Sequence, residues 1–214
     1  MTTCERTSPT PAVGVANVRV RTHSCGMDAF SAKPFVEASR RAFPFGIAAL
    51  ANAAASELSP FIDDTYRRPS EPICIKGKII AVPQRLHFVG LSADSDRLNS
   101  LNPASHCLIT RATDGRLRQQ ALRFVVDHQS SWVAPFVLVL LGEYVIEIVE
   151  DVRDALPVLD RSVYANLVRE NRPSVQRLRA KATSYWNAYY RHRYPQKRDY
   201  PGLQAIDEIE RWAV

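Results

Sequence analysis

The sequence predicts a mainly α-helical protein, either an irregular helical bundle or a short helical stack, with an extended N-terminal arm. Three observations lead to this prediction. From residue 113 onward, apolar side chains recur every three to four residues, the spacing that buries one face of a helix. Alanine, the strongest helix former, dominates residues 46–55. The β-branched residues gather mainly in residues 73–82, so we expect at most a minor β element there.

The composition is that of a folded protein with one loose end. The chain has 214 residues, of which 46% are hydrophobic and 23% charged, enough to bury a core without staples. Residues 1–26 are rich in Thr, Ser and Pro and show no periodicity. We therefore expect a flexible N-terminal arm over residues 1–26, followed by a single helical domain over residues 27–214.

Cysteine usage and hydropathy indicate a cytoplasmic protein without a membrane span. The four cysteines are too widely spaced for a metal site, and the first residues lack the apolar run of a secretion signal. The most apolar window, residues 132–149, is interrupted by Gly142, Glu143 and Glu147. Its uncharged part, residues 132–141, is too short to cross a bilayer core.

Proline and glycine divide the first half of the chain. Pro34, Pro44 and Pro60 are expected to mark the start, a break and the end of a helix within residues 35–58. Residues 73–82 read as a strand or extended segment without an identifiable partner. Residues 92–105 read as a connection with one short helical turn, because Ser, Asp, Asn and Pro are frequent in them.

A helix is expected to begin at Thr113 or Asp114, either of which can cap it. Its apolar face is Leu117, Ala121, Leu122, Phe124 and Val125, and its polar residues are expected to stay largely outside: Arg116, Arg118, Gln119 and Arg123. In a competing interpretation, Asp114-Gly115 is a hairpin turn between two strands. The helix is favoured because residues 119–123 are good helix formers and poor strand formers.

The same segment carries a family resemblance. Asp114 before the helix, Leu117 followed by Arg118, and Ala121 and Val125 on the buried face give it the spacing of the second helix of a HEAT-type repeat. With the helix that follows, the resemblance covers residues 113–156, about one repeat. The resemblance implies a binding scaffold rather than a catalyst. An irregular helical domain that shows the spacing by chance remains the alternative, because no second copy follows.

The next expected helix is capped by Ser130 or Ser131 and has Pro135 in its first turn. Its first half is apolar all round and should be enclosed by protein. Its second half carries an acidic stripe, Glu143, Glu147, Glu150 and Asp154. We interpret this stripe as a solvated or salt-bridged face. A metal site is the weaker alternative, because the Glu-x-x-His pairing of di-iron bundles is missing.

A last long helix is expected from Asn171 to about Tyr190, followed by a short one over residues 203–212. Charge is polarised here. Residues 161–198 contain ten Lys or Arg and one acid, whereas residues 143–160 contain six acids and one Arg. The neighbouring basic helix is therefore the natural partner of the acidic stripe.

A basic aromatic surface is the candidate functional site. Aromatic rings alternate with cations in residues 185–198, the pattern of a surface that binds anionic partners or single-stranded nucleic acid. The candidate partner-binding residues are Arg177, Lys181, Tyr185, Trp186, Tyr189, Arg191, Arg193, Lys197 and Arg198. Packing with internal charge pairing is the alternative explanation of this pattern.

The first functional hypothesis is a non-enzymatic helical interaction or scaffold protein that binds a protein or another anionic partner through this surface. The second is a nucleic-acid-binding protein that uses the same residues. The third is an enzyme whose site is assembled from distant side chains. No catalytic residue, metal ligand set or cofactor motif is identified, and the oligomeric state is left open.

Overall fold

The computed structural model describes residues 32–63 and 69–214, and these residues form a mainly helical fold with a small two-stranded antiparallel sheet. The predicted fold class is confirmed. The expected arm, residues 1–26, lies outside the described residues. The helices and strands are α1 (Ala32–Arg41), α2 (Ala48–Leu58), β1 (Ser70–Ile75), β2 (Lys78–Pro83), α3 (Pro103–Ile109), α4 (Gly115–Val125), α5 (Ala134–Leu138), α6 (Ile146–Asp154), α7 (Arg161–Glu170), α8 (Arg172–Tyr185) and α9 (Pro201–Trp212).

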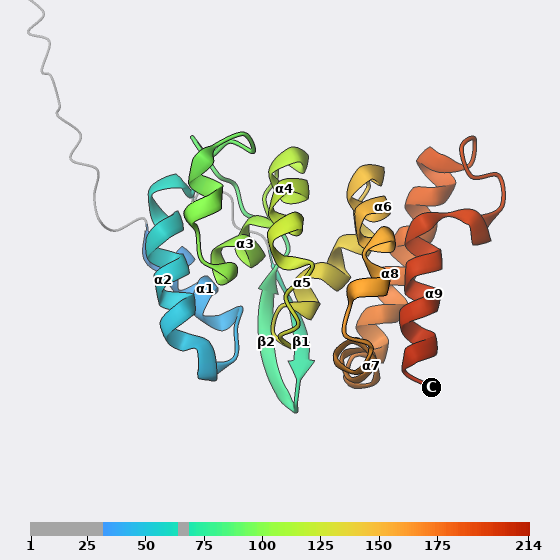
Figure 1. Ribbon diagram of the computed structural model, residues 1–214, viewed down its shortest axis with the longest axis horizontal. Helices are drawn as coiled ribbons and strands as arrows, with labels where there is room; N and C mark the ends of the chain where they lie inside the picture. Colours follow the sequence, from blue (N-terminus) through green and yellow to red (C-terminus); the bar gives the residue numbers. More distant parts are fainter. Residues whose placement is uncertain (1–31, 64–68) are drawn as a thin grey trace, which may run out of the picture.

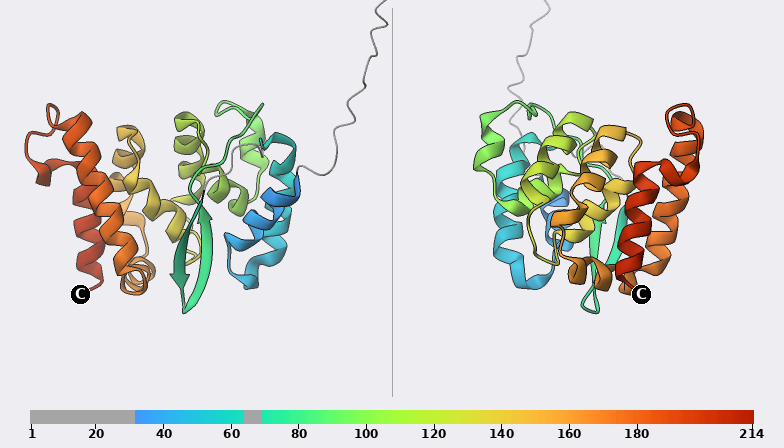
Figure 2. Two further views of the ribbon diagram at one scale, coloured as in Figure 1. Left: turned by 180° about the vertical axis from the view of Figure 1, so that it is seen from behind. Right: turned by 45° about the vertical axis from the view of Figure 1, so that its right-hand side comes forward.

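The helices lie side by side in a row from α1 and α2 at one end to α9 at the other (Figure 1). Neighbours in sequence pack as pairs, α1 with α2 and α3 with α4, and α9 packs against α6, α7 and α8. The hairpin of β1 and β2 lies across the back of this row and faces the viewer when the molecule is turned around (Figure 2, left). The hairpin therefore has helices of both ends as neighbours, α1 and α7.

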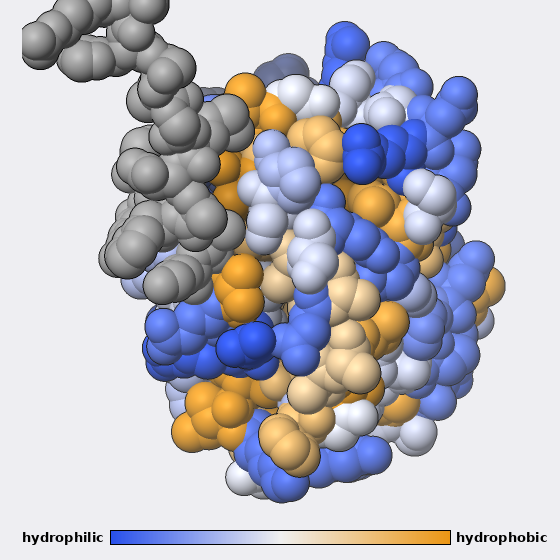
Figure 3. Space-filling view, turned by 90° about the vertical axis from the view of Figure 1, so that its left-hand side faces the viewer, coloured by the Kyte–Doolittle hydropathy of each residue, from blue (hydrophilic) through white to orange (hydrophobic). Residues whose placement is uncertain are grey.

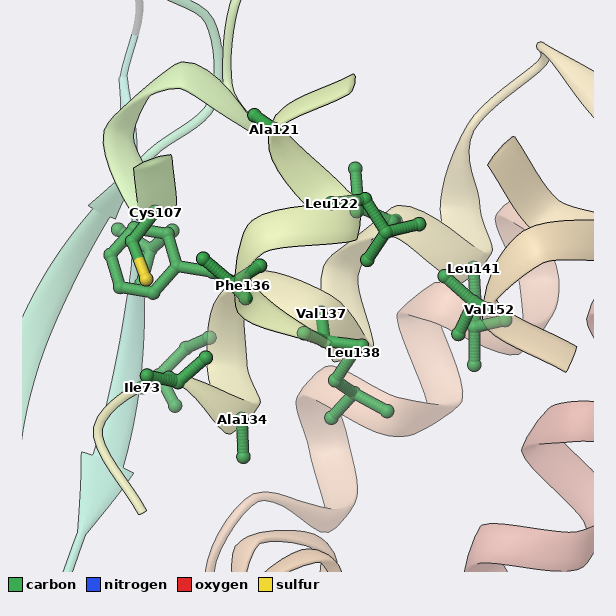
Figure 4. Packing of buried hydrophobic residues seen from close by; sticks show 14 of the residues in the cluster. Ile73, Cys107, Ala121, Leu122, Ala134, Phe136, Val137, Leu138, Leu141 and Val152 are labelled. Carbon is green, nitrogen blue, oxygen red and sulfur yellow. The ribbon is translucent and has the colours of Figure 1, made fainter. Parts of the chain in front are cut away.

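One contiguous hydrophobic core joins these elements. Figure 4 shows its centre, where Phe136 and Val137 of α5 lie among Ile73 from β1, Leu122 from α4 and Val152 from α6. All five residues of α5 are buried. The prediction that this stretch, apolar on all sides, is enclosed by protein is thus confirmed.

Residues 131–154 form two helices instead of the single predicted one. After α5, a 3₁₀ turn (Val139–Gly142) ends at Glu143, whose extended backbone leads into α6. The predicted caps Ser130 and Ser131 are also wrong, because α5 begins at Ala134 without a side-chain cap. α8 packs closely against the break, because a Cβ at Gly142 would lie 2.6 Å from Leu178 Cδ1.

The β element is a hairpin rather than one strand. Lys76 and Gly77 both have positive φ, 51° and 75°, and form the two-residue turn that reverses the chain. The missing partner of the predicted strand is therefore the second half of the same segment, with Cys74 opposite Ile79.

Several helix boundaries agree with the sequence. The Asp114 carboxylate accepts hydrogen bonds from the amides of Arg116 (2.8 Å) and Leu117 (3.2 Å), so it caps α4, and the competing hairpin turn at this position is wrong. The last long helix runs to Tyr190 as expected, its final turn a π-helix (Trp186–Tyr190). Residues 92–105 were expected to form a connection with one short helical turn. Instead, Asn102 caps the helix α3, which begins at Pro103.

The α1–α2 end of the row carries exposed apolar side chains. Figure 3 shows this end, where hydrophobic patches interrupt the charged surface. Phe45 is 88% exposed, and Ile47 and Leu50 are only partly buried. None of the helices within the described ranges combines the length and the apolar character needed to span a lipid bilayer.

Candidate functional site: a cationic cleft beside α8

A cleft of about 700 Å³ lies where the hairpin, the loop before α4, the loop after α5 and one face of α8 meet. This volume is in the range of small-molecule binding sites. The lining residues are Glu71, Ile73, Val82, Pro83, Gln84, Arg85, Arg111, Thr113, Arg118, Leu138, Val139, Tyr144, Asn171, Ser174, Val175, Arg177, Leu178, Lys181 and Tyr185.

Backbone pairing brings two of the arginines together. The segment that leaves β2 runs parallel to the one that leaves α3, with a bridge between Leu86 and Ala112. The Leu86 amide donates to the Arg111 carbonyl, and the Leu86 carbonyl accepts from the Thr113 amide, both at 2.8 Å. Arg85 and Arg111, distant in sequence, therefore lie on one wall of the cleft.

Three arginines surround one buried carboxylate, and we call Arg85, Arg111, Arg118 and Glu143 the arginine cluster. Glu143 is 1% exposed. Its Oε2 accepts a short hydrogen bond from Arg85 Nη2, and its Oε1 lies 3.5 Å from Arg111 Nη2. Arg118 Nη2 is 3.6 Å from Oε2, beyond hydrogen-bond range. One carboxylate thus faces three guanidinium groups.

Arg118 corrects the sequence prediction that placed it on the outer face of its helix. It is 0% exposed. Helical side chains lean toward the N-terminus of their helix, and Arg118 folds back over the first turn of α4. Its Nη1 donates to the carbonyls of Ala112 (2.7 Å) and Thr113 (2.9 Å). Its Nε and Nη2 have no hydrogen-bond partner among the described residues, so two buried nitrogens retain unused donors.

The cluster holds more positive than negative charge. Burial lowers the pKa of Arg111 to about 10, and the nearby Glu143 partly opposes this effect. The Arg111 guanidinium therefore remains charged at neutral pH. Since Glu143 supplies a single negative charge, two positive charges of the cluster lack a counterion among the described residues.

Lys181 adds a further positive charge at the edge of the cleft. The residue is exposed, but partial burial of its ammonium group lowers its pKa. Its Nζ lies 5.8 Å from the centre of the Tyr185 ring, a cation–π contact, and no ion pair of Lys181 occurs within the described part of the chain. The mouth of the cleft, in contrast, is balanced, because Arg177 pairs with Glu71 at 2.6 Å.

Asn171 fixes the hairpin to α8. Its Oδ1 accepts a hydrogen bond from the Cys74 amide at 2.8 Å, and its Nδ2 donates to the Cys74 carbonyl at 2.7 Å. The side chain is therefore not available for the predicted capping of α8, and it makes no capping bond. These two hydrogen bonds join β1 to the start of α8 and hold one wall of the cleft in place.

Tyrosine rings form the rim of the cleft. The rings of Tyr144 and Tyr185 are 6.3 Å apart, and Tyr189 continues the row at 6.2 Å from Tyr185. Tyr144 is 51% and Tyr189 59% exposed. Tyr189 belongs to the π-helical turn, a backbone feature that is frequent at functional sites. The rim thus presents aromatic surface to solvent beside the cationic wall.

The nine predicted partner-binding residues separate into three places. Arg177, Lys181 and Tyr185 line the cleft, and Tyr189 stands at its rim. Lys197 and Arg198 lie on the loop before α9, where Arg198 borders a second hollow that contains four arginines and three acids.

The remaining three of the nine are engaged within the fold. Trp186 Nε1 donates to the Tyr194 carbonyl at 2.8 Å. Arg191 lies over the Trp186 ring at 5.4 Å, and Arg193 pairs with Glu150 at 2.8 Å. The contiguous basic aromatic surface expected from residues 185–198 is therefore divided.

The acidic stripe is also divided. Glu150 pairs with the basic segment through Arg193, as expected, and also accepts from the Tyr194 hydroxyl at 2.6 Å. Asp154 pairs with its neighbour Arg153. Glu143 is the correction: it precedes α6, leaves the stripe and carries its carboxylate into the arginine cluster.

The geometry defines a helical protein with a preformed cationic cleft. Comparison of the chain with protein-family models, with curated proteins and with solved structures gave no significant match. The resemblance of residues 113–156 to a HEAT-type repeat therefore stays a prediction.

Proposed function

We propose that this chain is an interaction protein that binds an anionic group of its partner in the cationic cleft. The observation that carries the proposal is the arginine cluster, in which a single carboxylate faces three guanidinium groups. Arg177, Lys181 and Tyr185 of the predicted basic aromatic surface contribute to the same cleft.

Physical chemistry favours an added anion here. Removing a charge from water costs several kcal/mol unless a counter-charge and hydrogen bonds compensate it. Arg118 has unused donors on a fully buried side chain, and the pKa of Arg111 is depressed by its burial. An anion near these two groups would provide the missing counter-charge and acceptors, and guanidinium groups are well suited to phosphate and carboxylate.

Binding is favoured over catalysis because of what the cleft is made of. Its lining contains no histidine or cysteine. Its one lining carboxylate, Glu71, is engaged by Arg177 and Ser174, and Glu143, which is buried and not part of the lining, is engaged by the arginines. An enzymatic role would require these groups to leave their partners. We further propose a cytoplasmic location, which the free thiols of Cys74 and Cys107 support.

The test is a titration with inorganic pyrophosphate, measured by calorimetry and by thermal stability. We expect saturable binding, with a rise in Tm that follows ligand concentration as linkage requires. Lys181→Glu reverses one charge at the cleft edge and should weaken binding by about tenfold or more.

The matched control is Arg191→Glu, the same kind of charge reversal on an exposed residue outside the cleft lining. This variant should bind pyrophosphate within about twofold of the parent protein. If Arg191→Glu abolishes binding while Lys181→Glu has no effect, the contact lies on the C-terminal segment and the cleft proposal is wrong. If pyrophosphate does not bind, the proposed function fails as a whole.

A further inference from the structure

We propose that the ligand of the cleft is a nucleoside phosphate, with its phosphate at the arginine cluster and its base against Tyr144 and Tyr185. This inference rests on the proposed function, since it names the class of anion that the cleft takes. Its two supports are the size of the uncompensated charge and the position of the tyrosine rim.

The charge favours a phosphate over a carboxylate. The pair of Arg177 and Glu71 is neutral. The three arginines of the cluster and Lys181 carry four positive charges against the one negative charge of Glu143, which leaves an excess of three. A carboxylate brings one negative charge, whereas a phosphate monoester brings about two in one compact group with three acceptor oxygens. One phosphate can therefore compensate most of the excess.

Donor geometry points in the same direction. Arg118 Nε and Nη2 are unused, and both belong to one planar guanidinium group. Arg85 Nη1 donates to the Gln84 carbonyl and Arg111 Nε donates to the Pro83 carbonyl. These hydrogen bonds fix the planes of the two guanidinium groups. An oxyanion with several acceptors suits such fixed donors.

The rim favours a ligand with a flat ring. Tyr144 and Tyr185 line the cleft themselves, and Tyr144 is half exposed. Nucleobases stack on exposed tyrosine rings irrespective of sequence. Lys181 lines the cleft as well, with its ammonium 5.8 Å from the centre of the Tyr185 ring. A single cleft thus offers separate positions for the charged and the aromatic part of a nucleotide.

The experiment compares two ligands with the same phosphate, AMP and ribose 5-phosphate, by calorimetry. We expect AMP to bind at least about fivefold more tightly, because only AMP has a base to stack. Tyr144→Ala should remove this difference and leave the affinity for ribose 5-phosphate unchanged. Phe45→Ala, which also removes an exposed aromatic side chain but at the far α1–α2 end, should change neither affinity.

The outcomes separate the two proposals. If ribose 5-phosphate and pyrophosphate bind but AMP gains nothing, or if hexaglutamate binds more tightly than AMP, the nucleoside phosphate is wrong and the anion cleft stands. If no anion binds, both proposals fail. A dodecamer of deoxythymidine that binds more tightly than AMP, in a manner sensitive to Tyr144→Ala, identifies single-stranded nucleic acid as the source. Equal affinities identify the free nucleotide, and both results support the proposed chemistry.

Discussion

At the scale of single residues, the decisive feature is the position of Glu143 among three arginines. A buried carboxylate that neutralises only part of the charge around it has two effects. It stabilises the fold by satisfying the nearest guanidinium groups, and it leaves a positive potential in the cleft wall. Structure and binding therefore depend on the same side chain.

Replacing Glu143 by Gln should destabilise the protein strongly. The substitution keeps the shape but leaves three buried or partly buried guanidinium groups without an anion, which typically costs about 3–5 kcal/mol. Chemical denaturation in a buffer without multivalent anions measures this loss, and added phosphate should restore part of it by replacing the missing charge. Asp154→Asn, in an exposed pair, is the control and should cost at most about 1 kcal/mol. A loss for Glu143→Gln no greater than that of the control would contradict this account.

Lys181 should make anion binding depend on pH. Partial burial lowers its pKa, so its ammonium loses the proton at a lower pH than an ordinary lysine. Sulfate, whose charge is constant, should bind well at neutral pH and more weakly as the pH rises through this lowered pKa. Burial raises the pKa of Tyr185, so its hydroxyl stays neutral to higher pH than an ordinary tyrosine. Arg111, whose pKa burial lowers to about 10, can also lose its proton as the pH rises, so a variant of Lys181 is needed to separate the two groups.

The matched variant is Lys181→Arg, because a guanidinium holds its proton to higher pH. In this variant the loss of sulfate affinity should move to higher pH. Identical pH profiles for the two proteins would show that another group controls the titration.

At the scale of elements, the cleft exists because loops and strand ends are fastened to helices. The clamp between Asn171 and Cys74 joins residues that lie 97 positions apart, and the parallel bridge at Leu86 aligns Arg85 with Arg111. These two contacts between distant segments, rather than a regular sheet or helical bundle, hold the walls of the cleft in position.

Asn171→Ala should release the hairpin from α8. The change leaves the amide and the carbonyl of Cys74 without partners, at a cost of about 1–3 kcal/mol. Hydrogen exchange at the Cys74 amide should become faster, because this amide loses its hydrogen-bond acceptor. Asn187→Ala removes an exposed asparagine whose side chain accepts a hydrogen bond from Arg191, and the change should have little effect on stability. Unchanged protection of the Cys74 amide would mean that the clamp does not hold the hairpin.

Gly202→Ala should destabilise the packing of α9, although alanine is the better helix former. An added Cβ would meet Val149 Cγ1 at 3.1 Å and the backbone carbonyl of Leu141 at 3.3 Å. Overpacking of this kind costs about 1–3 kcal/mol. Gly46→Ala, whose Cβ meets nothing within 4 Å, is the control. If the Tm of Gly202→Ala equals or exceeds that of the unsubstituted protein, the close approach at Gly202 is contradicted.

At the scale of the whole molecule, local patterns predicted the fold class and several helices, but they missed α7 and the division between α5 and α6, and they predicted the site only in part. The cap at Asp114 and the enclosed α5 depend on short sequence windows, and both are confirmed. Periodicity alone placed Arg118 outside, because a helical pattern sorts residues by polarity and cannot show a buried counterion. Glu143 was assigned to a helical stripe for the same reason, since its i to i+4 spacing fits one.

The rest of the site depends on contacts between distant segments. Arg85 and Arg111 have no local signal, since neither lies in a motif and both reach the cleft through a loop bridge. Three of the predicted binding residues, Arg177, Lys181 and Tyr185, do lie in the cleft, because α8 presents one face to it. Their role in binding stays a prediction.

The most direct test of the anion cleft is the NMR signal of the Arg118 Nε–H group during titration with pyrophosphate. This nitrogen is buried and has no hydrogen-bond partner among the described residues. Binding in the cleft should shift its proton resonance downfield and protect it from exchange, with saturation at the calorimetric affinity. If the Arg118 signal stays unchanged while those of exposed arginines such as Arg191 move, anions bind elsewhere and the central claim is contradicted.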